Sequence, residues 1–129
     1  MAHRQRAQTL VEFSLTVGLL LFLALAAIQA TLYLHKRTSL EFVANEGAFE
    51  ASLAGRTNAD GERAVRDLWQ QFEPGGGTLQ VQVVRTGRVV VVIAAAPAPV
   101  VLLPSLIIPD IHVRAVHTIE AFAPGHGSP

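Results

Sequence analysis

The sequence has no cysteine, and ten acidic residues balance its ten lysines and arginines. Without cysteine the chain forms neither disulfides nor thiolate metal sites. A net charge of zero gives no electrostatic reason to expect a nucleic-acid partner. These absences exclude a disulfide scaffold and leave a chain of 129 residues, enough for one small domain and an anchor.

Motifs of catalysis and cofactor binding are also lacking. There is no HExxH motif, and the glycine run at 75–77 lacks the preceding strand and the Lys-Ser/Thr of a phosphate-binding loop, so we interpret it as a flexible joint. His112 and His117 lie five residues apart on a predicted strand, so their side chains point to opposite faces and do not share a metal ion. We therefore expect no enzymatic activity, no cofactor and no metal.

A long apolar run near the start is the most informative feature. Phe13 to Leu34 is 22 residues without a charge. As a helix it is about 33 Å long, enough to cross a hydrocarbon core of roughly 30 Å. The rest of the chain is too small to bury such a helix, so we predict a transmembrane span over residues 8–34. Basic residues precede the span (Arg4, Arg6) and follow it (Lys36, Arg37), so the positive-inside rule does not decide its orientation.

The start of the chain also suits an ordinary secretory signal. It has a basic region, an apolar region and a small-x-small cleavage site at Ala24-Leu25-Ala26. However, the apolar run continues to Leu34, whereas an ordinary signal has an apolar region of about 7–15 residues. A carboxylate at Glu12, at the front of the run, is also unusual for a signal.

The segment from Arg6 to Phe13, Arg-Ala-Gln-Thr-Leu-Val-Glu-Phe, followed by an apolar helix resembles the start of a type IV prepilin. More closely, it resembles the TadE-like minor pseudopilins of tight-adherence (Flp/Tad) pilus systems. The resemblance implies a leader of residues 1–7, cut by a prepilin peptidase between Ala7 and Gln8. Glu12 and Phe13 are then the fifth and sixth mature residues. Ala7 stands where the family usually has glycine, and the proline frequent in TadE-like spans is missing around Val17-Gly18.

The resemblance also implies a setting. The partners would be other pilin or pseudopilin subunits, the prepilin peptidase, an inner-membrane assembly platform and the lipid bilayer, with no nucleic acid. The chain would be a single-pass protein of the inner (cytoplasmic) membrane with its head extracytoplasmic, and later part of a pilus at the cell surface.

The physical chemistry of Glu12 suggests its role. Cleavage after Ala7 creates a free amine at Gln8, one helical turn from Glu12, which could pair with it or with the amine of a neighbouring subunit. An ion pair is strong at low dielectric and an unpaired partner is costly, so pairing would favour insertion in one register. The alternative is a carboxylate that marks the edge of the span among lipid headgroups.

Small residues in the span, Gly18, Ala26 and Ala30, could let another helix approach closely. Gln29 could hydrogen-bond between helices or simply lie near the outer boundary of the membrane.

The remainder predicts an α+β, pilin-like fold. An apolar stripe through Leu40 and Ala51 continues the helix to Ala54, with residues 35–55 outside the membrane, although a break at residues 35–37 is the alternative. A small head domain at 56–122 follows. It has a second helix, Asp60–Phe72, capped by Asp60 and burying an apolar stripe that includes Trp69 and Phe72. Three strands, at 78–85, 88–95 and 111–122, form a small antiparallel sheet, and residues 123–129 form a disordered tail.

The segment 97–110 is strongly apolar but contains four prolines, which fit neither a helix nor a ladder strand. An exposed apolar loop usually marks a contact. It either folds back over the sheet or meets a neighbouring subunit or the outer leaflet. The candidate contact residues are Val100, Leu102, Leu103, Leu106 and Ile107.

The sequence thus predicts a structural minor pilin or pseudopilin of a tight-adherence pilus, processed by prepilin peptidase and acting in pilus assembly or initiation. The alternatives are an uncleaved, single-pass, membrane-anchored accessory protein and a soluble domain secreted with a signal peptide.

Overall fold

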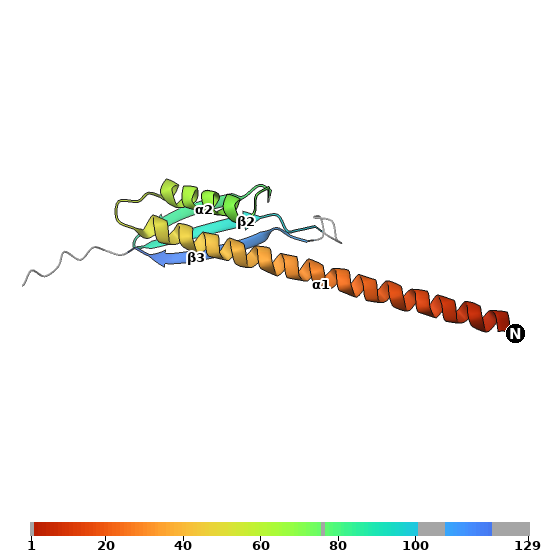
Figure 1. Cartoon of the computed structure of the whole chain (residues 1–129). Helices are drawn as coiled ribbons and strands as arrows, with labels where there is room; N and C mark the ends of the chain where they lie inside the picture. Colours follow the sequence, from red (N-terminus) through yellow and green to blue (C-terminus); the bar gives the residue numbers. More distant parts are fainter. Residues whose placement is uncertain (1, 76, 101–107, 120–129) are drawn as a thin grey trace, which may run out of the picture.

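The fold is a small α+β head on a long N-terminal helix, as the sequence predicts. A computed structural model of the chain describes residues 2–75, 77–100 and 108–119. Its elements are α1 (Ala2–Ser52), α2 (Asn58–Phe72), β1 (Gln80–Thr86), β2 (Val89–Ala96) and β3 (Ile111–Thr118). The C-terminal half of α1 lies on the head, and its N-terminal half projects away from it (Figure 1). The predicted tail at 123–129 lies outside the described residues.

Helix α1 is continuous over 51 residues, about 77 Å. The alternative of a break at residues 35–37 is therefore wrong. The helix ends at Ser52, two residues before the predicted Ala54, and begins at Ala2, so it includes the predicted leader. The predicted apolar stripe is confirmed, and every member of it is buried: Leu40, Val43, Ala44, Gly47, Ala48 and Ala51.

Helix α2 starts two residues earlier than predicted, and its N-cap is Thr57 rather than Asp60. The Thr57 side chain accepts from the backbone amide of Asp60, and the Asp60 carboxylate accepts from the Thr57 amide at 2.7 Å. This reciprocal capping box satisfies two amides that the helix leaves open. Trp69 is a core residue, only 3% exposed, as predicted. Phe72 is half exposed instead of buried, and its ring meets Phe42 edge-on at 5.6 Å.

The sheet is antiparallel, as predicted, and its order is β1-β2-β3, with β2 in the centre. The hairpin between β1 and β2 pairs Thr86 with Val89, and Gly87 takes the positive φ of 59° that this tight turn requires. Because side chains alternate along a strand, the row Val83, Val92 and Ala115 is buried. Both helices cover that face, α1 packing against β2 and β3 and α2 against β1 (Figure 1).

Two glycines bring α1 and α2 unusually close together. A Cβ atom on Gly47 of α1 would lie 2.0 Å from Cγ2 of Val65 in α2. A Cβ atom on Gly61 of α2 would lie 2.7 Å from the Cβ atom of Ala51. At this crossing the backbone of each glycine therefore lies against a side chain of the other helix. Neither glycine can be replaced by a larger residue unless the helices or these side chains move.

The C-terminus of α1 is capped from the sheet. The last turn of α1 has no basic residue of its own. Instead, Nη2 of Arg85 in β1 donates to the carbonyl oxygens of Ala51 at 2.7 Å and Arg56 at 3.0 Å. A guanidinium there satisfies a carbonyl that the helix leaves open and complements the negative end of its dipole. The contact joins the C-terminal end of α1 to β1.

Candidate assembly surface on α1

The N-terminal half of α1 has no cover within the described chain. Its most apolar stretch of 18 residues has a mean hydropathy of 2.3, and none of it is buried. Phe13 and Leu15, for example, are 66% and 68% exposed. By length and composition this half of the helix can cross a membrane. An apolar surface of this extent requires lipid or other helices around it.

The four residues of the predicted processing and pairing site, Ala7, Gln8, Glu12 and Phe13, are all exposed on this part of α1. The Ala7–Gln8 peptide bond lies inside the helix. Thr16 donates its hydroxyl to the backbone carbonyl of Glu12 at 2.8 Å. Among the residues that the structure describes, the ion pairs involve other carboxylates, and Glu12 takes part in none of them.

The small residues predicted to pack helices do not share one free surface. A Cβ atom on Gly18 would meet no atom within 4 Å, so this position is open. Ala26 and Ala30 instead line a groove between α1 and the chain's own Ile108 and Pro109. The small pair therefore lies where the head comes close to the span.

Gln29 ties the span to the head. Its side chain is buried, and Nε2 donates to the backbone carbonyl of Pro99 at 2.5 Å. Sequence reasoning left open a bond between helices or a position near the membrane boundary, whereas this bond is made within the chain itself. The signal was a lone amide in an uncharged run, but its partner lies 70 residues away and has no sequence signature.

Lys36, which sequence reasoning counted only as a flanking charge, is also turned toward the head. It is 8% exposed, and its Nζ atom lies 5.9 Å from the centroid of the Trp69 ring. A cation over the face of an indole is attracted by the ring's quadrupole. Its long aliphatic stem extends the buried stripe of α1 toward the membrane by one turn beyond Leu40.

The described ends of the 97–110 segment fold back toward the core. Ala98 is buried in the core cluster and Ile108 packs against it. Val100, one of the predicted contact residues, is 57% exposed. The other predicted contact residues lie outside the described part of the chain: Leu102, Leu103, Leu106 and Ile107.

The electrostatics of the head are simple. Hydrogen bonds from the backbone amide and the hydroxyl of Thr57 hold the pKa of Asp60 below its ordinary value of 3.8, because they favour the ionised carboxylate. The positive charges of Arg56 and Arg63 lower it further. This carboxylate caps the N-terminus of α2, and its lowered pKa gives no indication of a catalytic role.

The geometry therefore presents a bare apolar rod with a carboxylate at its front and a folded head at its rear. Residues 7–48 match the TadE-like protein family. This match confirms the resemblance inferred from residues 6–13 and the apolar run that follows them. No curated protein and no solved structure is significantly similar to the chain.

The matched segment covers two parts of α1. It includes the whole uncharged run, and it includes the stripe that is buried against the head as far as Ala48. The match associates the chain with the tight-adherence pilus and its components, and together with the apolar helix it marks a membrane-anchored protein. TadE-like proteins are a pilus-related structural family and no known family of enzymes.

Proposed function

We propose that the chain is a structural minor pilin or pseudopilin of a tight-adherence type IV pilus, and that it acts in pilus assembly or initiation. One observation supports this most directly: in a single unbroken helix, none of the most apolar stretch is buried, whereas the C-terminal half carries a stripe that is buried against the head. A subunit of that form transfers from lipid to a bundle of similar helices without refolding its head. The head remains extracytoplasmic while the helix is in the inner membrane.

Processing would be the step that prepares the helix for the bundle. A prepilin peptidase would cut between Ala7 and Gln8, removing the basic leader with Arg4 and Arg6. The TadE-like match begins at residue 7, beside the proposed cut. Because this bond lies in the first turns of α1, where helix ends fray, local unwinding would expose it to the enzyme.

After the cut, Glu12 would lie close to a new helix N-terminus and a new amine. Both attract its negative charge, since a carboxylate is stabilised at the positive end of a helix. A neighbouring subunit's amine offers the same counter-charge, and the pairing would set the depth at which one rod stacks against the next. The expected partners are therefore other pilin subunits, the peptidase and an inner-membrane assembly platform.

The mass of the mature chain from cells tests the processing step. A mature chain that begins at Gln8 is expected. A chain that begins at Met1 or Ala2 would support the uncleaved accessory protein, and one that begins near Ala27 would support a secreted soluble domain.

A charge substitution tests the pairing step. Removing one partner of a charged hydrogen-bonded pair costs about 1.5–3 kcal/mol, so Glu12→Gln should reduce incorporation into pilus fractions by about tenfold or more. Glu46→Gln, an exposed site on the same helix beyond the span, is the matched control and should incorporate normally. Equal incorporation of both variants would refute the pairing role.

A further inference from the structure

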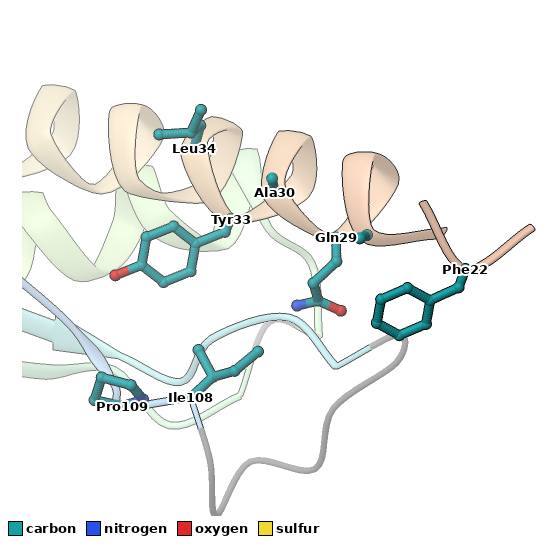
Figure 2. A pocket seen from close by; sticks show the side chains of 8 residues that line it. Phe22, Gln29, Ala30, Tyr33, Leu34, Ile108 and Pro109 are labelled. Carbon is teal, nitrogen blue, oxygen red and sulfur yellow. The ribbon is translucent and has the colours of Figure 1, made fainter. Parts of the chain in front are cut away.

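A groove runs along α1 where the span approaches the head. Its volume is about 500 Å³. Figure 2 shows Gln29 and Tyr33 projecting from α1 toward Ile108. The groove is lined by Phe22, Ala26, Gln29, Ala30, Tyr33, Leu34, Ile108 and Pro109. None of these residues is charged, and the Gln29 amide already donates to Pro99.

The helical wall of the groove belongs to the predicted span. Its helical wall, from Phe22 to Leu34, belongs entirely to the uncharged run. Gln29, which holds the head at Pro99, is five residues before the end of that run, about 8 Å along the axis. The edge of the head at Pro99 and Ile108 is therefore drawn down beside the last turns of the span instead of standing clear of the bilayer.

We propose that this groove holds one hydrocarbon chain of a phospholipid from the leaflet on the head's side. The groove surface is continuous with the lipid-facing surface of the span, none of whose most apolar stretch is buried. Two small alanines, Ala26 and Ala30, lie among bulkier, mostly apolar side chains in its lining. The site thus offers dispersion contacts to an apolar chain and no charged side chain.

The length and direction of the groove fit an acyl chain. Phe22 and Leu34 are about 18 Å apart along α1, which is comparable to the depth of one leaflet in a hydrocarbon core of roughly 30 Å. Because the groove follows the axis of the span, an acyl chain of that leaflet can lie along it.

The proposal rests on the membrane anchoring in the proposed function, but not on cleavage or pilus incorporation. The test uses the full chain in vesicles of phosphatidylethanolamine and phosphatidylglycerol that contain phosphatidylcholine with a nitroxide on its acyl chain. Electron paramagnetic resonance measures the motionally restricted fraction of this probe. Ala30→Trp adds a bulky side chain to the lining of the groove. Ala24→Trp is the matched control, because Ala24 is not among the lining residues and lies about 120° round the helix from Ala30.

The wild-type chain and Ala24→Trp should show the same restricted fraction, and Ala30→Trp should show a smaller one, reduced by the equivalent of one acyl chain for each protein. An equal restricted fraction in Ala30→Trp and Ala24→Trp would overturn the proposal. So would a second copy of the chain that cross-links to the groove residues while no lipid is restricted there. Ala30→Leu and Ala24→Leu repeat the comparison if circular dichroism shows that either tryptophan variant is misfolded. Because the measurement needs no pilus, a failure here leaves the mature N-terminus and the incorporation assay as independent tests of the proposed function.

Discussion

The crossing of α1 and α2 gives the sharpest quantitative prediction. In Gly47→Ala the new Cβ atom would lie 2.0 Å from Cγ2 of Val65, far inside van der Waals contact. Val65 cannot simply rotate away, because a β-branched residue in a helix has one strongly preferred rotamer. Overpacking at the upper end of its range, about 3 kcal/mol, exceeds the helix-propensity gain of about 1 kcal/mol from replacing glycine. The free energy of unfolding of the head should therefore fall by about 2 kcal/mol.

That loss corresponds to a decrease of about 8–16 °C in melting temperature for a head of this size. The measurement follows the fluorescence of Trp69, the single tryptophan, in the full chain in detergent micelles. Gly18→Ala is the control on the same helix, since its Cβ atom would meet nothing within 4 Å, and it should leave the transition unchanged. In a Val65→Ala background the Gly47→Ala change should cost much less, because the opposing methyl group is gone and the next contact, with the backbone oxygen of Gly61, is at 3.2 Å. If Gly47→Ala were neutral, or additive with Val65→Ala, the close crossing would be refuted.

Two further predictions concern the caps of the helices. Arg85→Met removes the charged donor from the end of α1, so it should lower the free energy of unfolding by about 1.5–3 kcal/mol in the same assay. Arg88→Met, at an exposed turn, is the control and should leave the free energy of unfolding unchanged. Equal effects of the two substitutions would count against capping by Arg85. Because the pKa of Asp60 is lowered on folding, its contribution is present above its unfolded value of about 3.8 and is lost as the pH falls through the folded value. The wild-type chain should melt higher than Asp60→Asn at pH 7, and the two should converge near pH 2; a gap that persists in acid would contradict this reasoning.

Much of the fold could be predicted because its signals are local or periodic. The stripe from Leu40 to Ala51 repeats at helical spacing, and Val81 and Val83 alternate with glutamines, so element type and buried face follow directly from the pattern. The errors occur where a local signal had two possible meanings. Asp60 is a good cap residue, but Thr57 three positions earlier makes the better box, with Asp60 as its reciprocal partner.

In the candidate site, too, local motifs could be predicted from the sequence, whereas contacts with distant residues could not. The positions of Ala7, Gln8, Glu12 and Phe13 follow from a contiguous motif, and all four residues are exposed on α1. Ala26 and Ala30 are predicted to pack against another helix, and that role stays a prediction. The structure adds that both residues line a groove beside the chain's own Ile108 and Pro109. Spacing along a helix tells which residues share a face, but not what stands opposite that face.

The sequence by itself determined the membrane-length run, the carboxylate at its front and the order of the elements, because hydropathy and periodicity act over neighbouring residues. Only the tertiary structure decided that Gln29 and Lys36 turn inward, that Gly47 and Gly61 meet at a helix crossing, and that Arg85 caps the rod. Each of these contacts joins residues far apart along the chain, and its energy depends on distances of a few ångströms that exist only after the head has packed against α1.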